Sequence, residues 1–481
     1  MKILLPTSLY PPHYVGGYEL GCRDVVEGLR GRGHEVQVLT STYGTGKAVV
    51  EGHVHRVLEH YFPEPNANGR AEVYPPMAAP QATGARPSEG LTRLQELVRR
   101  EWHDQRVLRN IVRQHQPDVI YFWSPTRLSK SLLTQSQRTG KPRVFYVFDH
   151  WLAQANDWDD PWFRFWERVP NKPIVRLGKR VLEQLLRVAG LVTREGCSGK
   201  PACGSGLPAP TGRPVSPSQR PALDTSAATP SPGWMEGAHL QFASQFLQQQ
   251  AATASTTAAS NTVIPWGLNL DQFPYRERTH PPTKLLYVGR LDSSKGVHTA
   301  IQALGILHRE LHLSDLTLTI VGTGAQDYMI RLHELVVREG LTNAIRFHGS
   351  TPREGLPALY AEHDILIFPS VWEEPFGIVL LEAMASGLAI VATLTGGSAE
   401  ILQDGKTALR FTKEDAADCA RQVQRLVQDS HLRSRLCRAA RQRVETAFNY
   451  QKVLLQMESV VCAAACSEAQ PRHAALAISA E

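Results

Sequence analysis

The chain lacks any long hydrophobic run, since none of its apolar stretches approaches the ~20 residues that a membrane-spanning helix needs. Its N-terminus, MKILLPTSLYPP, has one lysine and a short apolar run before its prolines, which is too short for a secretory signal peptide. This segment fits a first strand followed by a loop. These absences predict a cytoplasmic protein.

Cysteine is scarce, and nothing in its spacing resembles a metal site. Seven cysteines are scattered along the chain, and Cys197 and Cys203 form a lone pair, which is weak evidence for a metal. Free thiols in a reducing compartment are the expected state. Asp157, Asp159 and Asp160 lie in a Trp-rich loop rather than in a metal-binding motif. We therefore expect no metal and no cofactor.

The chain also lacks a stripe of Lys and Arg interleaved with aromatics, so nucleic acid is not an expected partner. The net charge of +6 is nevertheless uneven. Residues 1–265 carry 30 basic and 22 acidic side chains, an excess of +8, and the remaining residues carry −2. An anionic membrane face or an acidic acceptor would explain the excess. A solvated surface without a partner is the alternative.

Two series of strands and helices follow one another along the chain. In each, continuous apolar runs alternate with patterns of helical spacing, which predicts a parallel sheet buried on both faces. In the first series, strands are expected at 2–9, 34–42, 118–123 and 143–149, with helices at 16–33 and 127–140. In the second, strands are expected at 284–291, 316–322, 344–350, 364–370 and 388–393, with helices at 296–310 and 325–340.

We therefore predict an α/β protein with two Rossmann-like, doubly wound domains, residues 1–265 and 266–447. A helix over 448–465 is expected to cross back to the first domain. Other segments are rich in Pro, Gly, Ala or Ser, and their composition predicts disorder. These segments are the insertions 64–90 and 196–235 and the tail 466–481.

Cationic side chains follow one predicted strand of the second domain. Ligands of open α/β sheets bind at the carboxyl ends of the strands, so the residues after each strand matter most. Arg290 and Lys295 share one such loop, YVGRLDSSKG, and two cations there suggest a phosphate or diphosphate. Gly16 and Gly17 complement them, since glycines let an anion approach a helix N-terminus. Paired surface charges and a tight turn are the plainer alternatives.

One carboxylate stands in an apolar run. Glu382 lies in IVLLEAMA, which predicts a helix buried on every side, so this carboxylate needs a basic partner or a ligand. Glu374 precedes the same helix, which Pro375 opens, and Gly377 leaves room for a ligand at its N-terminus. Carboxylates accept hydrogen bonds from sugar hydroxyls, and a helix N-terminus favours negative charge. The arrangement suits a nucleotide sugar, which has two hydroxyl-rich rings joined by a diphosphate.

Together these motifs resemble one family. EEPFGIVLLEAMASGLAIVAT, with Glu400 following, is similar to the signature of the retaining GT-B glycosyltransferases of family 4 (glycosyltransferase group 1). YVGRLDSSKG and YPPHYVGGYE resemble its phosphate-binding loop and its N-terminal glycine loop, and IRFHGS and LPALYAEHDILIFPS fit the stretches between. The resemblance covers most of both predicted domains and excludes the insertions and the tail. It implies a GT-B fold, in which two Rossmann-like domains face a central cleft.

The resemblance also implies roles for residues. Arg290 and Lys295 would hold the diphosphate of the donor and stabilise its leaving charge. Glu374 would bind hydroxyls of the transferred sugar, and Glu382 would bind the ribose hydroxyls. The donor site would be completed by Gly16, Gly17, Gly322, Phe347, Gly349, Phe376, Gly377 and Ile378, with the base near residues 346–349.

The implied reaction moves a hexose from a UDP-, GDP- or ADP-linked donor to a sugar, lipid-linked or polysaccharide acceptor, in glycoconjugate synthesis. Configuration would be retained without a metal, because two cations and a helix N-terminus can neutralise the leaving group. Front-face attack, with the departing phosphate as base, needs no carboxylate nucleophile. Two alternatives stay open. A GT-B nucleotide-sugar epimerase would release free hexose, and a non-catalytic nucleotide-sugar-binding scaffold would bind without turnover.

The residues after the strand at 143–149 are further catalytic candidates. The family often has a histidine near the transferred sugar, and VFDHW matches it in two ways. Alignment on the tryptophan puts Phe148 at that position, and alignment on the histidine puts His150 there, with Asp149 between them. The loop VGTGA, which contains Gly322, departs from the more usual acidic form.

One segment suggests where the basic excess acts. The stretch 172–190, KPIVRLGKRVLEQLLRVAG, has helical spacing and places Arg176, Lys179, Arg180 and Arg187 among aliphatic residues, after a cluster of Trp and Phe. A basic amphipathic helix beside aromatics suits peripheral contact with an anionic membrane. A core-facing helix with a wet basic face is the alternative.

Overall fold

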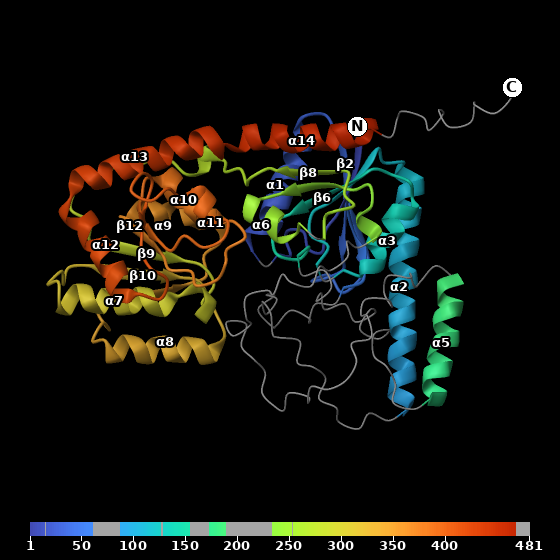
Figure 1. Cartoon of the computed structure of the whole chain (residues 1–481), viewed down its shortest axis with the longest axis horizontal. Helices are drawn as coiled ribbons and strands as arrows, with labels where there is room; N and C mark the ends of the chain where they lie inside the picture. Colours follow the sequence, from blue (N-terminus) through green and yellow to red (C-terminus); the bar gives the residue numbers. More distant parts are fainter. Residues whose placement is uncertain are drawn as a thin grey trace.

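The computed structural model describes residues 1–14, 16–60, 87–126, 128–153, 173–188, 233–252 and 254–467. These residues form two α/β units, and Figure 1 shows the last two helices running along both of them. Each unit is built on one sheet whose strands are nearly all parallel. Within the described ranges, none of the helices is both long enough and apolar enough to cross a membrane.

The first sheet has eight strands in the order β3-β4-β2-β1-β5-β6-β7-β8, and only the β3–β4 pair is antiparallel. The strands are β1 (Lys2–Pro6), β2 (Glu35–Ser41), β3 (Val49–Glu51), β4 (Val54–Leu58), β5 (Val119–Phe122), β6 (Arg143–Val147), β7 (His239–Phe242) and β8 (Ser260–Val263). The helices are α1 (Gly17–Gly31), α2 (Pro87–His115), α3 (Lys130–Arg138), α5 (Pro173–Val188), η3 (Gly233–Met235) and α6 (Gln245–Gln250).

The second sheet has six parallel strands in the order β11-β10-β9-β12-β13-β14. They are β9 (Lys284–Val288), β10 (Thr317–Val321), β11 (Ile345–Gly349), β12 (Ile365–Phe368), β13 (Ala389–Ala392) and β14 (Leu409–Arg410). The longer helices are α7 (Val297–Arg309), α8 (Gln326–Arg338), α10 (Ile378–Ser386), α12 (Ala416–Gln428), α13 (Ser430–Ala447) and α14 (Tyr450–Ser467). The short ones are η4 (Leu270–Gln272), η5 (Ser293–Lys295), η6 (Arg353–Gly355), α9 (Leu356–Glu362) and α11 (Ser398–Ile401).

Every strand and helix predicted from the two series of apolar and helical patterns is present. The limits of the predicted insertions and tail need correction, because residues 87–90, 233–235 and 466–467 belong to α2, η3 and α14. The rest of the predicted insertions and of the tail lies outside the described residues.

Helix α14 crosses from the second unit to the first. It packs against α1 and against strands β5, β6 and β7. Two backbone hydrogen bonds fix the point where it starts, because the N–H of Leu268 donates to Phe448 O over 2.8 Å and the N–H of Tyr450 donates to Leu268 O over 3.1 Å. Farther along, the Gln241 side chain on β7 donates to the Met457 carbonyl over 3.1 Å. The last helix therefore ties the segment between the two sheets to the first sheet.

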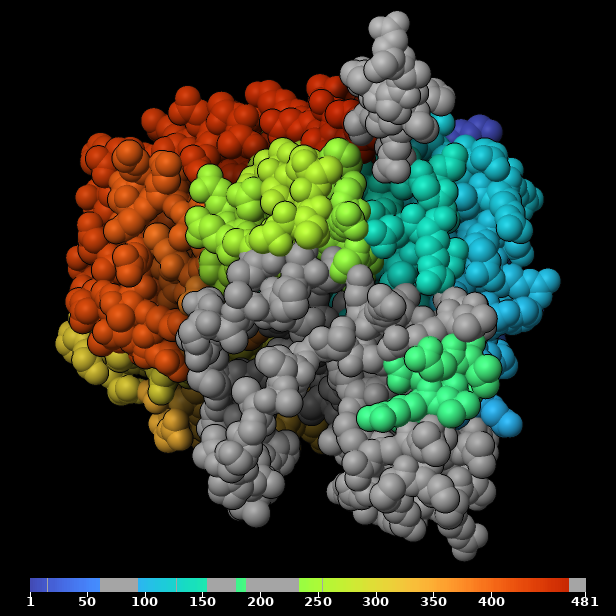
Figure 2. Space-filling view, turned by 45° about the vertical axis from the view of Figure 1, so that its right-hand side comes forward, coloured from blue at the N-terminus to red at the C-terminus, as the bar shows by residue number. Residues whose placement is uncertain are grey.

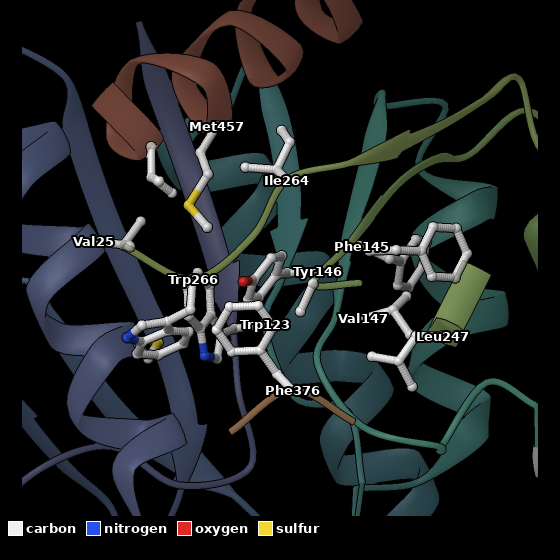
Figure 3. Close-up of a cluster of buried hydrophobic side chains, with 14 of the residues drawn as sticks. Val25, Trp123, Phe145, Tyr146, Val147, Leu247, Ile264, Trp266, Phe376 and Met457 are labelled. Atoms are coloured by element: carbon white, nitrogen blue, oxygen red, sulfur yellow. The ribbon is translucent and has the colours of Figure 1, made fainter. Parts of the chain in front are cut away.

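The buried core of the first unit is rich in aromatic rings. Figure 3 shows Trp123, Tyr146 and Trp266 clustered below Met457 of α14, with Phe376 of the second unit beside them. The ring centroids of Trp123 and Tyr146 are 4.6 Å apart. Phe376 is only 2% exposed, so a side chain of the second unit completes the core of the first.

Helix α1 reaches this core because it carries glycine where it meets Trp266. A Cβ atom on Gly21 would lie 1.7 Å from the Trp266 ring, and one on Gly28 would lie 2.3 Å from the Tyr450 hydroxyl. Any side chain at either position would push α1 away from Trp266 or α14. The packing of α1 against Trp266 and against α14 therefore depends on these glycines.

We expect Gly21→Ala to destabilise the protein by about 1–3 kcal/mol, since overpacking a close contact costs that much. The measurement is the urea midpoint of unfolding. Gly31→Ala, at the end of the same helix, is the matched control because no atom lies within 4 Å of its added Cβ. Equal midpoints for the two variants would contradict the proposed role of the Gly21 contact.

Candidate active site

Two loops of the second unit meet at the carboxyl edge of its sheet. Strands β9 and β12 pair in parallel, so the loops that follow them emerge side by side. Lys295 ends η5 after β9, and its Nζ lies 2.7 Å from Oε1 of Glu374, in the loop after β12. Ser370 donates to the same oxygen over 2.5 Å. Glu374 is 6% exposed, so its carboxylate is held by a cation and a hydroxyl at a nearly buried position.

Arg290 follows the same strand as Lys295 but has a different environment. Its side chain is 50% exposed, and its guanidinium lies 3.9 Å from the carboxylate of Asp292. The carbonyl of Arg290 accepts a hydrogen bond of 2.7 Å from the Tyr287 hydroxyl, which fixes the backbone. The structure thus gives one cation that is tightly paired and one whose side chain is half exposed.

The backbone is closely packed where β9, β10 and β11 end. The N–H of Gly322 donates to Gly349 O over 2.8 Å, and the N–H of Gly289 donates to Val321 O over 3.0 Å. A Cβ on Gly322, whose φ is +142°, would lie 1.8 Å from Gly289 O, so only glycine fits there. Phe347 lies on β11, two residues before Gly349. The centroid of its ring is 4.3 Å from the centroid of the His333 ring on α8. The predicted base-binding residues therefore sit at the ends of adjacent strands.

The N-terminus of α10 faces the first unit. Gly377 caps this helix with φ +125°, a conformation that favours glycine. A Cβ on Gly17, at the start of α1, would lie 3.4 Å from Cδ1 of Ile378, so the two helix starts are in close contact. The N–H of Gly16 donates to the Glu19 carboxylate over 3.0 Å. Predicted donor-binding residues from both units are therefore brought together.

Further contacts join the two units around this point. The Ser244 hydroxyl donates to Pro375 O over 2.7 Å. The Glu400 carboxylate accepts from the N–H groups of Gln245 and Phe246, over 2.8 and 2.7 Å, at the N-terminus of α6. A carboxylate from the second unit thus caps a helix of the first.

The candidates after β6 lie at the same junction. His150 is 9% exposed, with Nδ1 2.6 Å from Gln250 Oε1 and Nε2 3.0 Å from Glu373 O. Phe148 packs 4.8 Å from Trp266 and 6.0 Å from Phe376, between ring centroids. His150 therefore touches the loop of Glu374, and Phe148 touches the aromatic core.

Asp149 lies between these two residues and makes a local hydrogen bond. Its Oδ1 accepts from the N–H of Trp151 over 2.9 Å. Burial raises the pKa of Asp149 above its ordinary value, and the Trp151 hydrogen bond opposes that shift. Catalytic roles for His150 and Asp149 stay predictions.

Glu382 is buried, as the apolar run predicted, with 4% exposure. Among the residues that the structure describes, its hydrogen-bond partner is a phenol, because the Tyr360 hydroxyl donates to Oε2 over 2.7 Å. Burial raises the pKa of Glu382 to about 7, and the Tyr360 hydrogen bond and the Arg353 charge act in the opposite direction. The site therefore contains a carboxylate that changes charge close to neutral pH.

The sequence did not reveal several of these contacts. Ser370 is the last residue of the predicted strand that ends in FPS, so the carboxyl-end rule that selected Arg290 could have selected it too. Tyr360 and the partners of Glu400 gave no such signal, because their contacts depend on how helices pack. Within the described ranges, no group of three or more His, Cys, Asp or Glu side chains is arranged to hold a metal ion.

Two protein families match the chain. The family "Glycosyl transferase 4-like domain" matches residues 16–182, and the family "Glycosyl transferases group 1" matches residues 272–443. Glycogen synthase of Mycobacterium tuberculosis (strain CDC 1551 / Oshkosh) is 38% identical over 218 residues, or 44% of this chain and 51% of that protein. The alignment thus spans about half of that relative's length.

Solved structures share the architecture over nearly the whole chain. Sucrose-phosphate synthase from Thermosynechococcus elongatus has a TM-score of 0.61 at 17% identity, with 97% of this chain and 99% of that chain covered. HepE from Anabaena, solved with UDP, has a TM-score of 0.60 at 20% identity, with 96% and 100% covered. At such identities the likeness shows the fold alone. The chain belongs to the group 1 glycosyltransferases and has the GT-B fold that its motifs predicted.

We expect Glu382→Gln to be more stable than the wild-type protein at pH 8. The pKa of Glu382 rises from 4.5 to about 7 on folding, so the folded protein binds this proton more tightly than the unfolded chain. Stability therefore falls as pH rises from about 4.5 to about 7, by up to about 3 kcal/mol from this group. Glutamine keeps an acceptor for Tyr360 and carries no charge.

Urea unfolding of both proteins at pH 5 and pH 8 is the measurement for Glu382→Gln. The advantage of the variant at pH 8 should shrink at pH 5, where the wild-type carboxyl is protonated in the folded protein. A difference that is the same at both pH values would show that Glu382 is not the titrating group.

Proposed function

We propose that the chain transfers a hexose from a nucleotide-sugar donor to an acceptor hydroxyl, with retention of anomeric configuration and without a metal. The observation that carries this proposal is the Lys295–Glu374 ion pair next to the start of α10, which Gly17 of the other unit faces. A cation, a carboxylate and a helix N-terminus at one point suit a diphosphate joined to a sugar.

The donor would lie along the edge of the second sheet. Lys295 and the half-exposed Arg290 would bind the diphosphate, and Glu374, released from part of its ion pair, would accept hydroxyls of the sugar. Glu382 would accept the ribose hydroxyls, and hydroxyl donors would favour its charged form. The base would lie near Gly322 and Gly349. HepE, with the same fold, was solved with UDP and with UDP-glucose.

Charge stabilisation is the main catalytic contribution in this proposal. As the bond between the sugar and the diphosphate breaks, negative charge grows on the leaving oxygen, and fixed cations stabilise it without reorganisation. The departing phosphate would take the proton of the acceptor on the same face of the sugar. His150 and Ser244 bond to carbonyls of the loop that carries Glu374, so contact between the units would hold this loop in place.

The acceptor would bind to the first unit, where the basic excess lies. Helix α5 lies at the surface (Figure 2), and it exposes Val181 by 55% and Leu185 by 63%. Lys179 and Arg180 precede this apolar pair on the same helix. The Trp and Phe cluster before α5 lies outside the described residues. We propose peripheral contact of α5 with the cytoplasmic face of an anionic membrane, which suits a lipid-linked acceptor.

A screen of UDP-, GDP- and ADP-linked hexoses tests the function. A donor that binds should stabilise the protein, by about 2.7 kcal/mol at 100 times its dissociation constant. With an acceptor, mass spectrometry should detect the glycosylated product and free nucleoside diphosphate, and EDTA should leave the rate unchanged. Release of free hexose without a glycosylated product would favour an epimerase. Donor binding without turnover would favour a scaffold. Strict dependence of the rate on added metal would contradict the mechanism.

We expect Arg290→Ala to slow sugar transfer by about 10²-fold or more, the effect of losing one charge-stabilising group. The measurement is the single-turnover rate with bound donor. Arg331→Ala is the matched control, because Arg331 is also about half exposed, lies in the same unit and pairs with a neighbouring aspartate, Asp327. A normal rate for folded Arg290→Ala would remove Arg290 from the mechanism.

We expect the protein to co-sediment with vesicles that contain anionic lipid and to be released by added salt, which screens the attraction. Replacement of both Val181 and Leu185 by Ser should weaken sedimentation through lost apolar contact, and Lys179→Glu with Arg180→Glu should weaken it through repulsion. Ile330→Ser on α8, another half-exposed apolar position, is the control. Absence of binding at low salt would favour an acceptor that is free in solution.

A further inference from the structure

Tyr360 is held rigidly beside the carboxylate of Glu382. It lies on α9, which packs against α10, and its side chain is fully buried. Its ring makes an edge contact with Phe273 at 6.1 Å between centroids, and its carbonyl accepts from the Arg278 guanidinium over 2.7 Å. Ring and backbone are both fixed, so the hydroxyl can reach only a narrow set of positions. One of these positions is 2.7 Å from Oε2 of Glu382.

The hydrogen bond occupies one side of the carboxylate. Oε2 of Glu382 accepts from Tyr360, and this bond leaves the second carboxylate oxygen, Oε1, as the atom that can face a ligand. A buried carboxylate with one satisfied oxygen can still accept from a ligand through the other. The bond also limits rotation of the side chain, because a different rotamer would leave the phenol without a partner.

One further charge acts on this carboxylate. Arg353, in η6, favours the charged form of Glu382, and its guanidinium pairs with Asp24 of α1 in the other unit. Burial opposes both Tyr360 and Arg353 and raises the pKa of Glu382 to about 7. Near neutral pH, the charge of Glu382 therefore depends on its hydrogen bonds.

We propose that Tyr360 is a positioning residue that holds Glu382 in one orientation, so that Oε1 can accept the ribose hydroxyls of a nucleoside diphosphate. This inference rests on the proposed function. Tyr360 itself touches no ligand and acts only through Glu382. Its hydroxyl, rather than its ring, carries the effect.

Binding of UDP, GDP and ADP, and of their 2′-deoxy forms, tests the inference by isothermal titration between pH 5.5 and 8.5. In the wild-type protein the ribose form of the preferred base should bind at least about tenfold more tightly than the deoxy form, as expected for a hydroxyl bound to a charged group. Tyr360→Phe keeps the ring, and it should lose most of this ratio at pH 7. The ribose and deoxy forms carry the same phosphates, so titration of the phosphates does not affect the ratio of the two affinities.

The pH dependence separates positioning from packing. Ribose discrimination should fall as pH drops through about 7, where Glu382 becomes protonated. Without the Tyr360 hydrogen bond the pKa of Glu382 rises further, so in Tyr360→Phe the fall should begin at a higher pH. Tyr121→Phe is the matched control, because it removes a buried hydroxyl bonded to Gln241 in the other unit, and it should change neither the ratio nor its pH dependence.

Two more variants of the chain complete the test. If Tyr360 acts through Glu382, the double variant Tyr360→Phe with Glu382→Gln should bind like Glu382→Gln alone. This inference would be overturned if Tyr360→Phe kept the wild-type preference for ribose and its pH dependence while Glu382→Gln lost that preference. The proposed function would then still stand. No nucleotide binding by the wild-type protein, or normal discrimination in Glu382→Gln, would instead overturn the ribose site of the proposed function. If Tyr360→Phe fails to fold, Tyr360 is structural and the inference is overturned.

Discussion

The ion pair between Lys295 and Glu374 depends on a parallel pairing of strands. Because β9 and β12 run side by side in the same direction, the loops after them meet at one edge of the sheet. A nearly buried carboxylate would be costly without a partner, and Lys295 offsets that cost. The pair therefore fixes the loop that leads into α10, and with it the helix start that faces the first unit. The other contacts between the two units at this loop form only when the loop keeps that conformation.

Among the described residues, most hydrogen bonds between the units use the backbone on at least one side. Pro375 O and Glu373 O accept from the first unit, and the N–H groups that Glu400 binds belong to α6. Backbone groups keep their positions when side chains change, so contact of this kind tolerates sequence variation as long as the loops keep their shape. Gly17 shows the same dependence on shape, because an added Cβ there would lie 3.4 Å from Cδ1 of Ile378 in the second unit.

The sequence predicted the elements whose burial makes a simple pattern. Strands such as β5 and β12 are buried at every residue and appear as continuous apolar runs. Strand β7 was missed because Gln241 lies in its buried center, bonded to Tyr121 and Met457, and polar β8 is a sheet edge. Within the site, residues directly after strands were predictable by position. The bonds of Tyr360 to Glu382 and of Glu400 to α6 were not, since they join residues 22 and about 155 positions apart.

The cap that Glu400 places on α6 makes two amide hydrogens sensitive to separation of the units. The N–H groups of Gln245 and Phe246 stand in the first turn of α6, where no earlier carbonyl of the helix can accept them. Their acceptor belongs to the other unit, so they exchange with solvent when the two units move apart. Deep strand amides exchange only on larger unfolding. Hydrogen exchange at these two positions therefore measures separation of the two units in a chain that is otherwise folded.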